Sequence, residues 1–241
     1  MKQVRKYLLV MFCVVACVVN AQTTVSWDYP IKPGTEAWDQ CRSTAEIHEK
    51  LNIPDPILKV LDTESLLQIC LDYPTLLVFY VTDTPQQGFE DFCKRFNGIR
   101  ELMNRKDVGR FLLQKYCRMS MTDFNPLWTL DEQGKFVFRF YFMESFLAQP
   151  QSMNSFDATE RDLLLKESIR KYELKESRSD LFGGVSIGTT IWIVAKTLHF
   201  ENKLQVNSSD LPRIEHALQS GDVAGFNVQA VVQQAKRYAD E

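Results

Sequence analysis

A glycine-rich stretch at residues 183–190 (GGVSIGTT) has the residue spacing of a phosphate-binding loop. In such a loop, backbone N–H groups surround the phosphates, and a lysine after the last glycine contacts them. Here Thr189 occupies the position of that lysine, and no clear strand leads into the stretch. We therefore interpret the three glycines as positions where a buried helix packs closely against its neighbours, and we expect no cofactor.

Histidine, a common metal ligand, occurs three times, as His48, His199 and His216. No two of them are four residues apart, the spacing that places two imidazoles of one helix on a single zinc ion. His48 and His216 each adjoin a glutamate, which predicts solvated helix faces. His199 follows an apolar segment and is placed to stabilise the C-terminus of a helix there. We predict no metal site.

Three nucleophilic side chains, Cys93, Cys117 and Ser186, could each be paired with a histidine if the fold brought them together. Neither a cysteine-protease signature nor an S-x-x-K motif with its partner motifs supports such a pairing. Paired carboxylates such as Glu90 and Asp91 are typical of an ordinary surface. We predict no catalytic residue, although a helical glycosidase could carry its two carboxylates far apart in the sequence.

Basic residues are concentrated between positions 94 and 118, where eight of them stand against two acidic ones, a local charge of +6. The basic residues are Lys94, Arg95, Arg100, Arg105, Lys106, Arg110, Lys115 and Arg118. Four of these, Arg100, Arg105, Lys106 and Arg110, form a candidate binding ridge for an anionic glycan, a lipid head group or an acidic protein. A solvated helix face that pairs with the acidic remainder of the chain is the simpler interpretation, and we favour it.

Residues 1–21 have the layout of a secretory signal peptide. Three basic residues lie within the first six positions, residues 7–19 are uncharged and almost wholly apolar, and a small residue, Ala21, ends the segment. An apolar core of this length is too short for a bilayer, which needs about 20 helical residues. We predict a secreted or periplasmic protein. The alternative is a lipid anchor on Cys17, since the residues before it fit the cleavage pattern of bacterial lipoproteins.

Removal of this leader would leave 220 of the 241 residues, enough for one good hydrophobic core. Without the three basic residues of the leader, the 28 basic residues become 25, against 31 acidic ones, so the net charge is −6. Mild acidity argues against a nucleic-acid partner. No second apolar stretch reaches the length of a membrane span. Four cysteines remain (Cys41, Cys70, Cys93 and Cys117), and we interpret them as small buried side chains.

Helix-start signals recur behind the leader and predict about ten short helices. They are Ser43 with Glu46, Asp55 before Pro56, Thr84 before Pro85, Thr159 to Asp162, and Asp210 with Pro212; Ser220-Gly221 is a stop signal. We predict an extended segment at 22–42 and one all-α domain at 43–241. Its architecture is predicted as stacked helical hairpins, either a short α-solenoid or an irregular bundle.

Two aromatic and β-branched stretches, 75–81 and 135–142, could be strands on propensity alone. The second follows a Glu-Gln-Gly sequence that resembles a turn, but it continues into a good helix. We predict both as helical and keep a small α+β fold as the alternative. Residues 181–198 form the most hydrophobic segment behind the leader, and we expect this helix at the centre of the core.

Several short strings of residues resemble, in order and spacing, an uncharacterised family of secreted proteins from gut bacteria. They are YPIKPGTEAW at 29–38, IP at 53–54, CLDYP at 70–74, FNGIREL at 96–102 and RKD at 105–107. The resemblance covers roughly residues 28 to 200. It implies a mostly helical domain, and it implies no activity and no functional residue.

These observations favour a secreted or envelope-associated helical protein that acts by binding another molecule and has no catalytic role. The alternative is an envelope hydrolase whose site is dispersed in the sequence, and a third possibility is a purely structural role. Convergence of a cysteine, a histidine or two carboxylates in one cleft would favour the hydrolase. A basic groove would favour the binding protein.

Overall fold

The computed structural model describes residues 26–225 and 227–239, and the predicted signal peptide lies outside them. The described residues form 13 α-helices, two short 3₁₀ helices (η1 and η2) and no strand. This confirms the all-α prediction. In chain order the elements are α1 (Glu36–Asp39), α2 (Thr44–Leu51), α3 (Asp55–Leu58), α4 (Thr63–Leu71), η1 (Leu76–Tyr80), α5 (Pro85–Arg95), α6 (Asn97–Asn104), α7 (Val108–Arg118), η2 (Met121–Asp123), α8 (Leu130–Leu147), α9 (Pro150–Ser155), α10 (Ala158–Ser177), α11 (Gly184–Phe200), α12 (Leu211–Ser220) and α13 (Val228–Ala239).

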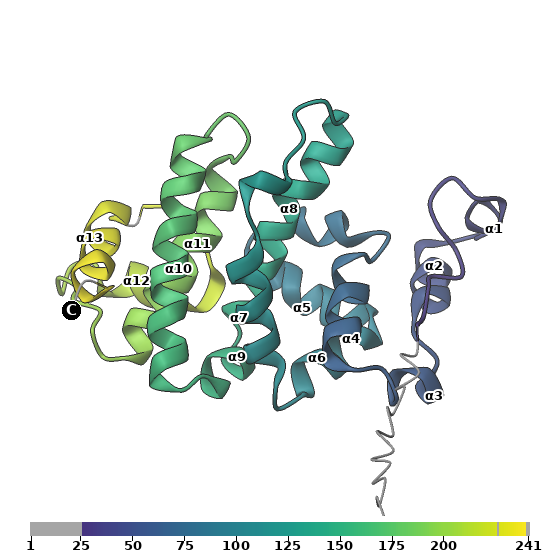
Figure 1. The fold of residues 1–241 in the computed structure, drawn as a ribbon, viewed down its shortest axis with the longest axis horizontal. Helices are drawn as coiled ribbons and strands as arrows, with labels where there is room; N and C mark the ends of the chain where they lie inside the picture. The colour runs from purple at the N-terminus through teal and green to yellow at the C-terminus, as the bar shows by residue number, and fades with distance from the viewer. Residues whose placement is uncertain (1–25, 226, 240–241) are drawn as a thin grey trace, which may run out of the picture.

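The helices follow one another across the molecule in nearly the order of the sequence. Figure 1 shows α1 to α6 at one end, α7 to α9 in the middle and α10 to α13 at the other end. The long helices α10 and α11 pack against each other, and α11 also packs against α8, α12 and α13. Most side chains of α11 from Ser186 to Leu198 are buried, although residues 183–185 at the start of the predicted apolar segment are exposed. Within the described residues, no helix combines the length and apolar character needed to cross a membrane.

Two of the five predicted helix-start signals act as side-chain caps, whereas Asp55 is the first residue of α3 behind Pro54 and Asp210 makes no cap hydrogen bond. The side chains of Ser43 and Thr84 accept hydrogen bonds from backbone N–H groups three residues later, and Pro85 occupies the first turn of α5. Gly221 ends α12 in the left-handed conformation, with φ of 77°. In α10 the cap is Asp157, two residues before the predicted start at Thr159, because Asp157 and Glu160 satisfy each other's backbone N–H groups.

Both ambiguous stretches are helical, but they differ from each other in type. Residues 76–80 form the 3₁₀ helix η1, whereas 135–142 lie inside the 18-residue helix α8. The turn that the Glu-Gln-Gly sequence at 132–134 suggested does not form, because these residues lie within α8. The helix already begins at Leu130, where Thr129 and Glu132 form a capping box.

The glycines of the phosphate-loop-like stretch do not all serve close packing. A Cβ atom on Gly183 or Gly184 would meet nothing within 4 Å, so the expectation of close helix contact was wrong at these two positions. Only Gly188 is crowded, because a Cβ there would lie 3.2 Å from the Val223 side chain. Gly183 instead caps α11 in an extended conformation.

The largest hydrophobic cluster lies beneath α2 to α9 and is rich in aromatic rings. Tyr73 lies at its centre, with ring centroids 5.1 Å from Phe92 and 4.6 Å from Phe96. Smaller clusters lie between α10, α11 and α13 and beneath the loop that precedes α8. The loop before α8 is therefore anchored by its own aromatic side chains, which matters for the site described next.

Candidate anion-binding site

A pocket of about 250 Å³ opens where the chain passes from α7 to α8. It receives side chains from the end of α4, the last turns of α7, the connection that contains η2, and the middle of α8. We call it the cationic–aromatic pocket; its lining residues are Leu71, Lys115, Arg118, Met119, Ser120, Asp123, Trp128, Phe136, Arg139 and Phe140.

Aromatic rings form one wall of this pocket. The ring centroids of Trp128 and Phe136 lie 5.8 Å apart, and those of Phe136 and Phe140 lie 5.5 Å apart. Phe140 in turn meets Phe182, at 5.3 Å and nearly perpendicular, and both of these rings are buried. The Phe136–Phe140 and Phe140–Phe182 pairs are packed edge to face and Trp128 is tilted by 52° against Phe136, so the rings hold one another in position before any ligand binds.

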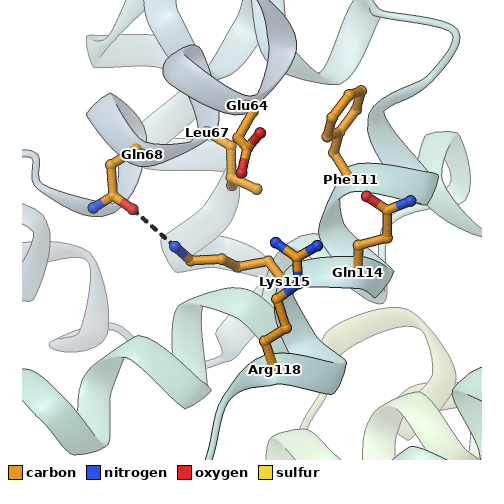
Figure 2. Close-up of a pocket in the computed structure, with 7 residues that line it drawn as sticks. All are labelled: Glu64, Leu67, Gln68, Phe111, Gln114, Lys115 and Arg118. Atoms are coloured by element: carbon orange, nitrogen blue, oxygen red, sulfur yellow. Dashed lines mark hydrogen bonds between the residues drawn. The ribbon is translucent and has the colours of Figure 1, made fainter. Parts of the chain in front are cut away.

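Three cationic side chains and one carboxylate line the same pocket. Lys115 donates a hydrogen bond from Nζ to Gln68 Oε1 at 3.0 Å, and Arg139 lies 3.6 Å from an Asp72 carboxylate oxygen. Figure 2 shows Lys115 reaching from α7 to Gln68 of α4, with Arg118 beside it. The shallow recess in that view has a volume of only about 10 Å³, roughly enough for one water molecule. Lys115 and Arg118 also line the larger pocket, which is where a ligand would fit.

The pocket therefore joins positive charge to an apolar aromatic wall. The guanidinium groups of Arg118 and Arg139 can each donate two parallel hydrogen bonds to a carboxylate or a phosphate. The faces of Trp128 and Phe136 can pack against the apolar part of the same molecule. A cleft of this kind attracts an anion and repels a cation.

Two of the four residues of the predicted ridge are engaged in hydrogen bonds within the protein. Arg100 donates from Nη1 to the carbonyl oxygens of Cys93 and Lys94, at 2.7 and 3.2 Å, and so satisfies the C-terminus of α5. Arg105 donates to Glu101, to the Thr63 hydroxyl and to the Leu58 carbonyl. It therefore ties α6 to α3 and α4.

The other two ridge residues are exposed. Lys106 lies in the turn before α7, and Arg110 places its guanidinium carbon 5.4 Å from the centroid of the Phe111 ring. None of the four ridge residues lines the cationic–aromatic pocket. The pocket uses Lys115 and Arg118 from the far end of the same basic segment, together with Arg139, whose sequence context carried no charge signal.

His48 is buried, so the prediction of a solvated face was wrong. Only 7% of the residue is exposed, and its Nδ1 lies 2.7 Å from the Tyr73 hydroxyl while its Nε2 lies 3.5 Å from Arg95 Nη1. Burial, and then the nearby charge of Arg95, lowers the pKa of His48 below its ordinary value of 6.5. Glu49 still points to solvent, but the helix turns the neighbouring imidazole inward.

The remaining histidines are exposed. His199 lies in the last turn of α11, as predicted, and His216 places Nε2 3.8 Å from an Asp222 carboxylate oxygen. Among the residues that the structure describes, no group of three or more histidine, cysteine, aspartate or glutamate side chains is placed to hold a metal ion.

The candidate nucleophiles are poorly placed for catalysis. Burial raises the pKa of Cys93 to about 11 and raises that of Cys117 as well, so both remain thiols at neutral pH. Cys70 is fully buried, and the four cysteines behind the leader are all free, with Cys41, Cys93 and Cys117 only half-buried. The interpretation as buried small side chains therefore holds fully for Cys70 alone.

Residues 184–188 (GVSIG) also match the G-x-S-x-G pattern of hydrolases, in which the serine lies on a sharp turn between a strand and a helix. In the structure Ser186 instead lies in the first turn of α11, and its hydroxyl is buried. Its carbonyl oxygen accepts a hydrogen bond from Lys175 at 2.7 Å. The match therefore lacks the backbone geometry that would expose a nucleophile.

Comparison of the chain with protein-family models, with curated proteins and with solved structures finds no match. The resemblance of residues 28 to 200 to a family of secreted proteins stays a prediction.

Proposed function

We propose that this protein is a secreted or envelope-associated helical binding protein that holds an anionic group in the cationic–aromatic pocket. One observation carries the proposal: Lys115, Arg118 and Arg139 surround a ligand-sized cavity with preformed aromatic walls. The predicted leader at residues 1–21 supports the location.

Three of the side chains that a hydrolase could have used are poorly placed for catalysis. Cys93 and Cys117 are held as thiols, and His48 is occupied by Tyr73 and Arg95. The pocket itself is basic and contains a single carboxylate, that of Asp123. A basic pocket of this kind favours binding over the alternative of an envelope hydrolase.

Binding of three small probes tests this function. We expect phenyl phosphate to bind more tightly than inorganic phosphate, because its ring adds contact with Trp128 and Phe136. Phenyltrimethylammonium, which has the same ring and the opposite charge, should not bind. Affinities are measured by calorimetric titration of the purified protein at low salt, where surface charge is least screened.

A matched pair of variants locates the site. Arg118→Gln and Arg110→Gln each remove one exposed arginine from α7, but only Arg118 lines the pocket. Arg118→Gln should weaken phenyl phosphate binding about tenfold, the loss of one charged hydrogen bond of roughly 1.5 kcal/mol. Arg110→Gln should leave it unchanged. Absence of binding by both anions, or equal losses in the two variants, would overturn the proposal.

A further inference from the structure

A second depression, of about 710 Å³, lies next to the pocket on the surface formed by residues 28–33, the end of α4, η1 and α8. We call it the apolar groove. Its apolar lining consists mainly of Leu71, Leu76, Leu77, Val78, Phe138 and Phe142. Two of these side chains are unusually open to solvent for their type, with Leu77 38% and Val78 48% exposed. The groove therefore presents apolar surface that the fold itself does not cover.

The groove and the pocket adjoin each other, and we call the two together the cleft. Leu71 and Arg139 line both of them, so the two depressions meet at these side chains. Arg139 projects from α8 at the junction, where it faces Asp72 at 3.6 Å. A molecule lying across the junction would contact Arg139 and could reach Arg118 at one end and Val78 at the other.

Charge is distributed unevenly along this cleft. Within the groove, Lys32 is paired with Asp28 at 2.6 Å, and Lys135 is paired with Asp131 at 2.6 Å, so both lysines are neutralised locally. In the pocket, Lys115, Arg118 and Arg139 outnumber the single carboxylate of Asp123, and they still do so when Arg139 is counted as paired with Asp72 at 3.6 Å. The positive field is therefore concentrated at the pocket, and the groove is close to neutral.

The groove also lacks the features that recognise an extended peptide. Peptide binding by strand addition needs an open sheet edge with free backbone N–H and C=O groups. Helices and the 3₁₀ helix η1 form the groove, and the described part of the chain contains no strand. Contact there is made mainly by aliphatic and aromatic carbon, which suits a hydrocarbon chain.

We propose that the cleft binds a single-chain anionic amphiphile, with its head group against Arg118 and Arg139 and its alkyl chain along the apolar groove. This inference rests on the proposed function and adds the class of ligand. Each methylene buried in the groove should strengthen binding about fourfold, the equivalent of about 0.8 kcal/mol.

Chain length separates this inference from the proposed function. Decyl phosphate and butyl phosphate carry the same head group, and below the micelle concentration we expect decyl phosphate to bind at least about a hundredfold more tightly. Decyltrimethylammonium, with the same chain and a cationic head, should bind weakly. Equal affinity for the two phosphates would overturn the amphiphile inference but not the proposed anion-binding function. Failure of both phosphates to bind would overturn the inference and the proposed function together.

Variants in the groove give a second, independent test. Val78→Asp places a carboxylate on exposed groove surface and should lower decyl phosphate affinity at least tenfold while leaving butyl phosphate affinity unchanged. Val60→Asp changes a valine that is 60% exposed and lies outside the groove, so it should alter neither affinity. If Val78→Asp does not fold, as judged by circular dichroism, Leu77→Asp is tested in its place, again with decyl phosphate affinity as the readout. Unchanged decyl phosphate affinity in the groove variant, or an equal loss in Val60→Asp, would overturn the inference.

Discussion

At the scale of single residues, the state of His48 follows from what its two neighbours can donate. The guanidinium of Arg95 has donors and no acceptor, so its contact with His48 Nε2 at 3.5 Å favours the tautomer in which Nε2 is unprotonated. The proton then resides on Nδ1, which donates to the Tyr73 hydroxyl. His48 is therefore a neutral, structural histidine whose role is to join α2 to the residues after α4.

The lowered pKa of His48 predicts a stability that depends on pH. In the unfolded chain the imidazole gains its proton near pH 6.5, whereas in the folded protein it does so at a lower pH. Between those two values the unfolded state binds more protons, so the free energy of unfolding falls as the pH falls through this window. The His48→Gln variant should therefore show a weaker dependence of its unfolding free energy on pH in this window.

Urea unfolding at a series of pH values from about 7 to 5 measures the effect. The control variant is His199→Gln, which removes an exposed imidazole. If the unfolding free energies of the wild type and His48→Gln change with pH in parallel, the buried environment of the imidazole is not maintained in solution.

At the scale of single elements, several helix boundaries were predictable because their hydrogen bonds are local. The caps at Ser43, Thr84 and Gly221 depend on atoms within four residues. Glycines inside helices were less predictable, because their cost depends on what lies opposite them. Gly134 in α8 has open space where a Cβ would lie, whereas a Cβ on Gly109 in α7 would collide with Ser155 and Phe156.

This difference predicts opposite effects of one substitution in two helices. Gly134→Ala should stabilise the protein by roughly 0.5–1 kcal/mol, because alanine loses less conformational entropy in a helix. Gly109→Ala should destabilise it by about 1–3 kcal/mol, because α7 would have to move away from α9. Thermal unfolding of the two variants measures both changes. A stabilised Gly109→Ala would contradict the close packing of α7 on α9.

At the scale of the whole molecule, a buried ion pair joins four helices. Glu144 of α8 and Lys175 of α10 are both fully buried, with 2.7 Å between Oε2 and Nζ. The Glu144 carboxylate also accepts hydrogen bonds from the hydroxyl groups of Tyr116 in α7 and of Thr189 and Thr190 in α11. Lys175 also donates to the Ser186 carbonyl and to the Thr190 hydroxyl. Burial lowers the pKa of Lys175, and the carboxylate of Glu144 opposes that shift.

Breaking this pair should be more harmful than neutralising it. Lys175→Met leaves the Glu144 carboxylate buried without its counter-charge and should cost about 3–5 kcal/mol of folding stability. Adding Glu144→Gln removes the stranded charge and keeps an amide oxygen for the hydroxyl groups, so the double variant should recover part of the loss. Urea unfolding measures both, and a double variant less stable than Lys175→Met would contradict the account.

The sequence by itself determined the class of the fold, because capping boxes, proline at helix starts and apolar periodicity are local properties that favour helix. It also predicted the burial of most of α11, since a helix that is apolar on most sides is stable only when surrounded. Only the tertiary structure decided the burial of His48, the pairing of Glu144 with Lys175 and the pocket around Arg118 and Arg139. Each of these depends on side chains more than twenty residues apart, and the packing of whole helices, which no local pattern encodes, brings those side chains together.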